Sequence, residues 1–246
     1  MSLSFDRVAA CYDETRGGER CGREFAIDVL RWLAPGTVLE VGVGTGLVAA
    51  SVAAAGTPVF GVDVSPEMAK RAYARLGPRL ALGDARALPV RGACVDSVLF
   101  VMVLHVVVDV PAALAEAARV LRPGGRVVTI HAAPEPEGSD LTKASEPLEG
   151  VRVARPDDLA ALTTAAAGAG LTALHEGWTS PYTVSRTPHQ AADGVERKIW
   201  SYLWGLDEAA WEAHAVPAIR ALRALPEPDR PRRTTQRHRL TVFEMV

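Results

Sequence analysis

Runs of β-branched and other apolar residues alternate along the chain with segments whose apolar residues recur at helical spacing. Such a run starts at Val38 and predicts a buried strand, and small-residue segments ended by glycine or proline predict helices. Strands are predicted over 38–43, 59–64, around Leu80, over 95–103 and over 126–131, and helices over 45–55, 65–76 and 111–121. Strand, helix, strand in this order makes a right-handed parallel crossover, so the pattern predicts a doubly wound α/β sheet.

The flanking segments are less regular. Residues 5–33 have helical spacing and predict two helices before the sheet. Residues 133–150 are rich in proline, glycine and acids, which predicts a surface loop. A helix beginning at 155–158, a strand over Leu171–Trp178, a helical stretch over about 189–225 and a final strand over 238–246 complete the prediction.

Composition excludes several classes of protein. The chain has 246 residues, 48% of them apolar and 23% charged, which is typical of a globular domain. With 27 basic and 29 acidic side chains, the net charge of -2 lacks the basic excess of a protein held to nucleic acid by phosphate contacts. Three cysteines without a CxxC pair, and histidines without HExxH spacing, predict neither a disulfide framework nor a metal site.

The sequence also gives an expectation about location. There is no secretory signal, and the longest apolar stretch, Val98 to Val108, is interrupted by His105 and too short to span a bilayer. We therefore expect a cytoplasmic protein without a membrane span. Arginine and alanine are abundant and lysine is rare, which suggests a bacterial source with a GC-rich genome.

Three glycines mark the turn after the first strand. Gly42, Gly44 and Gly46 are spaced as GxGxG, and Glu40 precedes them inside the strand. Without side chains, such a turn lets backbone N–H groups approach a ligand closely. The spacing differs from the GxGxxG of dinucleotide-binding helices, which disfavours a nicotinamide dehydrogenase. A tight strand-to-helix turn without a ligand is the alternative.

Two acids follow the next strands. Asp63 ends the second strand, at the carboxyl edge of the sheet, where a carboxylate can accept hydrogen bonds from a ribose diol. Asp84 ends the third strand, where it can accept from an exocyclic adenine amine while Ala85 offers its backbone N–H to the ring. Helix N-caps are the alternative role for both acids.

Taken together, four segments resemble a known family. VLEVGVGTG, VFGVDVSPEM, GDARALP and ALAEAARVLRPGGRVV occur in the order and spacing of the class I S-adenosylmethionine-dependent methyltransferases. The opening FDRVAACYDETR is similar to the N-terminal helix of the small-molecule branch that includes the ubiquinone and menaquinone methylases. The resemblance covers Phe5 to His131 well, and beyond His131 it extends to the general plan only.

The resemblance implies a fold. That fold is a Rossmann-like, three-layer αβα arrangement around a seven-stranded, mostly parallel sheet whose last strand is antiparallel. It implies a single domain over 1–246, with an N-terminal helical cap (1–34), a cofactor-binding core (35–135) and a variable substrate-side half (136–246). A helical insertion over about 187–226 precedes the last strand.

The resemblance also implies which residues bind S-adenosylmethionine, whose product is S-adenosylhomocysteine. Glu40 and the three glycines would hold the methionine half, with Arg16 reaching its carboxylate, and Asp63 would bind the ribose. Val64 and Met68 would pack on the adenine, Asp84 and Ala85 would read its edge, and Val101 with Met102 would offer backbone near the sulfonium. For Met68, a place in the core is the alternative.

Candidate catalytic residues are few. Methyl transfer gains most from alignment and exclusion of water, and a histidine can take the proton of the nucleophile. His105 and His131 follow strands at the edge of the glycine turn, and Tyr12 can close over the site with its ring near the sulfonium. Structural histidines at strand ends, and an amphipathic helix that packs Tyr12 on the core, are the alternatives. Many relatives have a second histidine where this chain has Val106, so the substrate chemistry does not transfer.

Aromatic residues and arginines in the last third bear on the substrate. Trp200, Tyr202, Trp204 and Trp211 suggest an apolar or planar small molecule, unless they only dock their helices on the sheet. The cluster of Arg230, Arg232, Arg233, Arg237 and Arg239 raises an RNA substrate, but no aromatic is interleaved for base stacking, so a solvated loop is expected.

The sequence therefore predicts an S-adenosylmethionine-dependent methyltransferase acting on O, N or C of a small organic molecule. The alternatives are an RNA methyltransferase and a non-catalytic S-adenosylmethionine-binding protein. Monomer and homodimer are equally compatible with the sequence.

Overall fold

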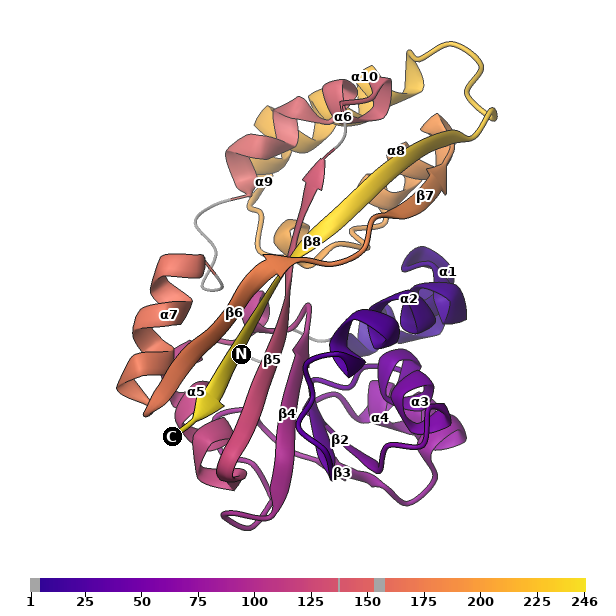
Figure 1. Ribbon diagram of the computed structural model, residues 1–246. Coiled ribbons are helices and arrows are strands. Elements are labelled where there is room, and N and C mark those ends of the chain that lie inside the picture. Colours follow the sequence, from indigo (N-terminus) through magenta and orange to yellow (C-terminus); the bar gives the residue numbers. More distant parts are fainter. Residues whose placement is uncertain (1–4, 137, 153–157) are drawn as a thin grey trace. The chain divides into compact units, whose positions relative to one another are not determined.

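The computed structural model describes residues 5–136, 138–152 and 158–246, and their strands form one mixed sheet (Figure 1). The strand order is β3-β2-β1-β4-β5-β8-β6, with β7 paired to β8. Neighbours from β3 to β5 run parallel, and β8 runs antiparallel to β6 and β7. The strands are β1 Val38–Val41, β2 Val59–Asp63, β3 Leu80–Leu82, β4 Val95–Val101, β5 Leu121–Pro136, β6 Leu171–Trp178, β7 Tyr182–Arg186 and β8 Arg232–Met245. This confirms the predicted Rossmann-like fold and adds β7 to it.

Helices cover both faces of the sheet. Figure 1 shows α2, α3 and α4 on one side, and α5 and α7 on the other, which is the predicted three-layer arrangement. Side-chain caps fix three helix starts: Ser65 accepts from the N–H of Met68, and Asp109 and Asp158 cap the helices that follow them. The helices are α2 Gly18–Leu30, α3 Leu47–Ala54, α4 Pro66–Leu76, α5 Val110–Val120 and α7 Leu159–Gly168.

The chain divides into two compact units. Unit 1 contains Met1–Ala133, Pro156–Ser180 and His238–Val246, and unit 2 contains Pro134–Arg155 and Pro181–Arg237. Strands β5 and β8 continue from one unit into the other. Fully buried side chains such as Phe100, Leu114 and Phe243 form the core of unit 1, while Leu203 and Leu222 belong to the core of unit 2.

Unit 2 corrects two predictions. The expected loop over 133–150 is wrong for its described residues, because β5 runs to Pro136 and two short helices follow it. The expected helical stretch over 189–225 is interrupted, since Lys198 adopts a positive φ of 50°. The helical elements of this unit are α6 Asp140–Ala144, η4 Glu146–Val151, α8 Pro188–Glu196, η5 Ser201–Leu203, α9 Glu208–Ala210, η6 Trp211–Ala215, a π-helix, and α10 Val216–Arg223.

The two chain ends also differ from the prediction. The N-terminal segment begins with short turns, η1 Phe5–Arg7, η2 Ala9–Cys11 and α1 Tyr12–Thr15, before the regular helix α2. At the other end β8 starts at Arg232, so most of the arginine cluster lies on a strand and the expected solvated loop is wrong there. None of the described helices is both long and apolar enough to cross a lipid bilayer.

Candidate functional site

The glycine turn joins β1 to α3 and has a left-handed backbone at all three glycines. Gly42, Gly44 and Gly46 all have positive φ, of 70°, 57° and 82°. At Gly42 a Cβ would lie 2.3 Å from Cγ2 of Val103, so the segment after β4 and this turn approach too closely for any side chain. Glycine is therefore required here by both conformation and space.

Glu40 of β1 is a buried acid beneath this turn. Its side chain is 2% exposed and accepts a hydrogen bond from the backbone N–H of Ala49. Its other carboxylate oxygen, Oε2, has no hydrogen-bond partner among the described residues. Burial raises the pKa of Glu40 to about 8, with a further contribution from the nearby Asp63. The site thus contains an unsatisfied acceptor at a depth where water rarely supplies a donor.

Asp63, at the end of β2, holds the turn in place. Its carboxylate is buried and accepts from the backbone N–H of Gly44 at 2.7 Å and of Ser65 at 2.8 Å. Burial raises the pKa of Asp63, while these backbone hydrogen bonds oppose the shift. Asp63, the residue predicted to bind the ribose, is therefore adjacent to the glycine turn.

Tyr12 lies against the same turn. A Cβ at Gly44 would be 3.9 Å from Cε1 of the ring, and the guanidinium carbon of Arg16 lies 5.5 Å from the ring centre. Burial raises the pKa of Tyr12; Arg16 opposes this shift and Asp63 contributes to it. The structure thus brings together five predicted residues from three elements: Tyr12, Arg16, Glu40, Gly44 and Asp63.

Two acids that the sequence analysis missed fasten the N-terminal segment to this site. Asp13 accepts from Oγ1 of Thr45 at 2.6 Å and pairs with Arg75 of α4 at 2.7 Å. Asp6 accepts from Oγ of Ser65 at 2.5 Å. We name residues 5–16 the N-terminal strap. The residues that Asp6 and Asp13 contact are distant in sequence, so the helical pattern of the strap does not reveal these contacts. The only signal in the sequence is the presence of two acids within that pattern.

The residues expected to contact adenine have mixed surroundings. Val64 is 52% exposed, whereas Met68 is 1% exposed and lies in the core. Asp84 is partly exposed and forms an ion pair with Arg86 at 2.6 Å, and this hydrogen bond lowers the pKa of Asp84. Ala85 packs at the margin of the core of unit 1.

The ends of β4 and β5 carry the other candidates. Val101 ends β4, Met102 has a positive φ of 51°, and His105 lies on η3, Leu104–Val106. His131 is 6% exposed, and its Nε2 lies 2.9 Å from Oγ1 of Thr241. Thr241 also contacts Oγ1 of Thr129 at 2.6 Å, so His131 belongs to a buried polar network.

The aromatic residues of unit 2 contact cations of the same unit. Trp200 and Tyr202 stack at 6.2 Å, with Arg186 over the first ring at 5.1 Å and Arg152 over the second at 5.2 Å. The remaining two rings also make contacts within the unit, since Trp204 donates to the carbonyl of Lys198 and the ammonium of Lys198 lies over Trp211.

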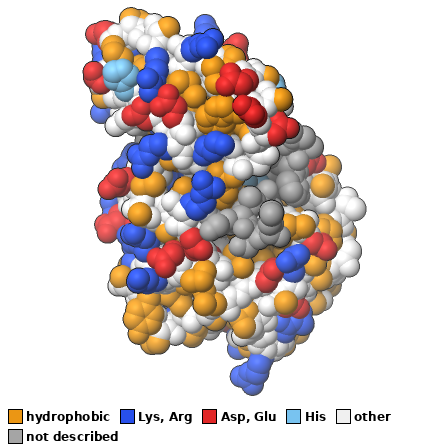
Figure 2. Space-filling model, turned by 180° about the vertical axis from the view of Figure 1, so that it is seen from behind, with side chains coloured by type: hydrophobic (Ala, Val, Ile, Leu, Met, Phe, Trp, Pro, Cys, Tyr) orange, Lys and Arg blue, Asp and Glu red, His pale blue; other side chains and the backbone are white. Residues whose placement is uncertain are grey.

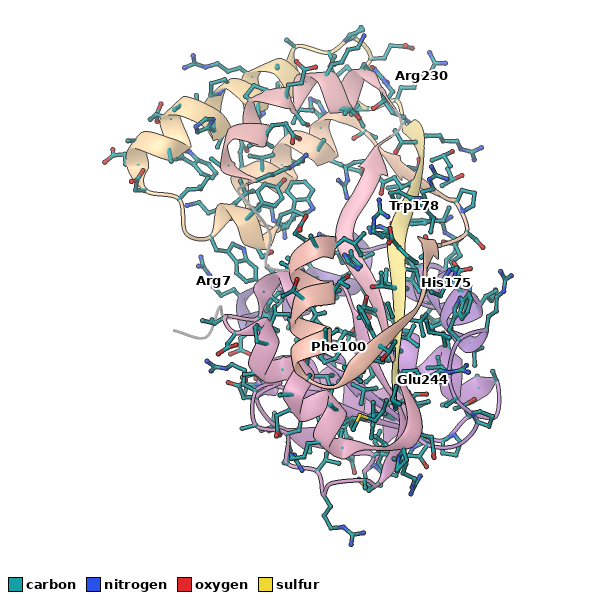
Figure 3. All side chains as sticks on the ribbon, turned by 60° about the vertical axis from the view of Figure 1, so that its left-hand side comes forward. Arg7, Phe100, His175, Trp178, Arg230 and Glu244 are labelled. Carbon is teal, nitrogen blue, oxygen red and sulfur yellow. The ribbon has the colours of Figure 1, made fainter. Side chains whose placement is uncertain are left out.

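Acids neutralise much of the arginine cluster. Arg230 pairs with Glu227 at 2.8 Å and Arg232 with Asp140 at 2.9 Å. Arg239 pairs with Glu176 and lies 4.6 Å from the ring centre of Trp178. Figure 3 labels Arg230 before β8 and Trp178 on β6. Arg230, Arg232 and Arg239 thus each have an acidic partner, which reduces their capacity to bind phosphates.

Comparisons with known proteins agree with this geometry. Residues 39–129 match the model of a family described as a methyltransferase domain. The chain is 37% identical over 135 residues to the demethylmenaquinone methyltransferase of Tropheryma whipplei strain Twist, covering 50% of this chain and 55% of that protein. The chain therefore spans about half the length of the curated relatives it matches.

Solved structures share the fold. The protein in complex with a methyltransferase activator of Haloferax volcanii has a TM-score of 0.61 at 20% identity, covering 99% of this chain and 96% of that one. The geranyl diphosphate C-methyltransferase of Streptomyces coelicolor, in complex with S-adenosyl-L-homocysteine, has a TM-score of 0.54 at 16% identity, covering 93% and 79%.

These findings define the class of the core. Residues 39–129, with the glycine turn, Glu40 and Asp63, form a Rossmann-like S-adenosylmethionine-dependent methyltransferase domain. More particularly, this segment belongs to the class I methyltransferases, with distant homology to the demethylmenaquinone methyltransferases.

The residues of the site fit that cofactor. The unpartnered Oε2 of Glu40 suits an ammonium group, and the positive-φ glycines leave room for a ligand beside the backbone. Among the described residues, no group of three or more histidines, cysteines or acids lies close enough together to hold a metal ion.

Proposed function

We propose that this chain binds S-adenosylmethionine at the glycine turn and methylates O, N or C of a small organic molecule. The observation that carries the proposal is the buried Glu40, whose free carboxylate oxygen lies under a glycine turn that Tyr12 contacts. A buried acceptor without a donor is unfavourable unless a ligand supplies one.

Each candidate residue has a task in this proposal. Glu40 with Gly42, Gly44 and Gly46 holds the methionine end, and Arg16 neutralises its carboxylate. Asp63 accepts from the ribose hydroxyls. The adenine is bordered by Val64, Asp84 and Ala85, with the Val101 backbone nearer the methyl group, while Met68 stays in the core.

The cofactor supplies an electrophilic methyl group on a positively charged sulfur. Tyr12 offers a ring face to a cation, and burial raises the pKa of its hydroxyl further above neutrality. His105 or His131 takes the proton of an oxygen or nitrogen nucleophile. A neutral imidazole can do this near pH 7 without a metal. The substrate class we favour is an apolar or planar small molecule, since the sequence over 200–211 is rich in aromatic residues.

Calorimetric titration tests the cofactor assignment. We expect S-adenosylmethionine to bind and NAD not to bind. Asp63→Asn is expected to weaken binding by about 1–3 kcal/mol, because a charge-assisted hydrogen bond to the ribose is lost. Glu212→Gln, which changes an exposed acid of unit 2, is the matched control and is expected to leave the affinity unchanged.

The same preparations test turnover. S-adenosylhomocysteine production is measured with a panel of small phenols, amines, quinols and acidic carbon compounds. Absence of S-adenosylmethionine binding contradicts the proposal. Tight binding without production from any compound favours a non-catalytic binding protein instead.

A further inference from the structure

An apolar groove of about 380 Å³ lies in unit 1, and none of its lining residues belongs to the glycine turn. The crossover from β3 to β4 contains no helix, so the sheet face under residues 83–94 is covered only by loop. Phe60, Val62, Ala81, Pro89 and Val90 are among the lining residues. Figure 1 labels β2 and β3 side by side, and Figure 2 shows hydrophobic side chains among basic and acidic ones in the lower part of the view from behind.

The groove borders an open strand edge. Strand β3 is the terminal strand of the sheet, and no described strand pairs with its outer side. On the inner side, the carbonyl of Arg79 accepts from Gly61 and the N–H of Gly83 donates to Asp63, both at 2.9 Å. Because alternate residues of a parallel strand face opposite neighbours, the N–H and C=O groups of Leu80 and Leu82 point outward.

Side chains at this edge are apolar and accessible. Phe60 is 45% exposed and Leu82 is 57% exposed. Large apolar side chains beside unpaired strand backbone are unusual on a protein surface, since such edges promote association. The edge therefore suits an occupant that supplies both backbone hydrogen bonds and apolar side chains.

The charge at the groove narrows the occupant further. Its lining residues include the two cations Arg79 and Arg91 and no acid. A second copy of this chain would bring the same arginines of both copies together, which is unfavourable. An occupant with acidic side chains is attracted instead.

We infer that this edge binds an extended, acidic and apolar segment of a partner protein, which adds to the sheet as a strand beside β3. The backbone of Leu80 and Leu82 supplies the pairing, the groove takes apolar side chains, and Arg79 and Arg91 pair with acids. The inference is independent of the proposed methyl transfer, because the groove shares no residue with the cofactor site.

Two labelled peptides test it. One is an eight-residue peptide that alternates Val and Glu, and the other alternates Val and Lys. Fluorescence anisotropy of each peptide is measured as the full chain is titrated up to about 1 mM, so that dissociation constants up to about 1 mM are detected. We expect the Val-Glu peptide alone to bind, with lower affinity at higher salt. Hydrogen exchange is expected to slow at Leu80 and Leu82 in the presence of the peptide, more than at Ala81.

Charge reversal gives the sharper comparison. Arg79→Glu combined with Arg91→Glu is expected to weaken the Val-Glu peptide about tenfold and to create binding of the Val-Lys peptide. Arg230→Glu combined with Arg233→Glu in unit 2 is the matched control, with no expected effect. Leu82→Pro removes one outward N–H at a position where an edge strand tolerates proline, and is expected to weaken binding.

Three results overturn the inference. They are failure of the Val-Glu peptide to bind, equal binding of the two peptides, and an unchanged affinity in the charge-reversed chain. Analytical ultracentrifugation tests whether a second copy of the chain occupies the edge. If the chain forms a dimer, Leu82→Pro dissociates it and neither peptide binds, the edge belongs to a second copy instead.

Discussion

Glu40 is the residue whose environment differs most from its behaviour in water. Its carboxyl group is fully surrounded by protein, with one hydrogen bond from Ala49 and one oxygen without a partner. An ionised carboxylate in such a place is unfavourable, so the folded protein holds it neutral at pH 7. A cationic ligand reverses this preference, because it makes the charged form the favoured one.

The stability of the ligand-free protein is therefore expected to depend on pH through Glu40. The unfolded chain releases this proton near pH 4.5 and the folded chain near pH 8, so between these values the folded state binds more protons. Stability contributed by this group falls as pH rises through that window, by up to about 1.4 kcal/mol per pH unit. Glu40→Gln lacks this loss. Urea unfolding at several pH values is expected to show the variant gaining on the wild type from pH 5 to pH 8, and parallel curves would contradict the neutral state.

Gly42 makes a second prediction at this scale. Gly42→Ala puts a Cβ 2.3 Å from Cγ2 of Val103 at a positive φ of 70°. We expect a loss of about 1–3 kcal/mol in the free energy of unfolding, from backbone strain and overpacking together. Adding Val103→Ala is expected to recover the part due to overpacking. Equal losses in the single and double variants would assign the whole effect to the backbone.

Among the elements, the N-terminal strap connects the start of the chain to the glycine turn and to α4. Asp13 is its main attachment, since it contacts both Thr45 and Arg75. Asp13 and Arg75 are 31% and 25% exposed, so solvent screens their pair only in part. The strap is thus held by a few polar contacts together with the burial of Val8 and Ala9.

Removing that attachment is expected to loosen the strap selectively. Asp13→Ala is expected to raise hydrogen exchange over residues 5–16 about fivefold, as the loss of roughly 1 kcal/mol implies. The affinity for S-adenosylmethionine is expected to fall with it, because Tyr12 is less well placed. Glu14→Ala, an exposed acid of the same turn, is the control. Unchanged exchange over residues 5–16 in Asp13→Ala would show that packing alone holds the strap.

The sequence predicted the fold correctly where the spacing of apolar residues matches the period of the strand or helix that forms. The parallel strands and the helices between them were predicted because their apolar residues repeat at strand or helix spacing. Strand β7 and the early start of β8 were missed, since their pairing places Arg232 and Arg233 opposite Arg186 and Ser185 and makes a strand of a charged segment. The Asp13 attachment was missed for a similar reason: Arg75 is its partner only in the folded chain.

For the whole molecule, the two compact units raise the question of cooperativity. Unit 2 is formed by two segments separated in sequence, and β5 and β8 belong to both units. When one unit unfolds, the part of β5 and β8 that belongs to it is lost, and the pairing of the same strands in the other unit is weakened. We therefore expect the chain to unfold as one domain, as the sequence predicts.

Calorimetry of two core variants tests this expectation. Leu222→Ala removes a fully buried side chain of unit 2, and Phe243→Ala removes one of unit 1. Each is expected to lower the free energy of unfolding by about 2–5 kcal/mol and to shift the same single transition. Two transitions, each moved by only one of the substitutions, would instead identify two independently unfolding domains.

The place of β8 in the sheet has a consequence for biosynthesis. This strand lies between β5 and β6, yet it follows both of them along the chain. On the ribosome, β5 and β6 emerge while the strand between them has not been synthesised, so their facing edges stay open until β8 follows. A nascent chain stalled before Arg232 is therefore expected to need chaperone protection. Once β8 has been synthesised and has paired with β6, this need is expected to end.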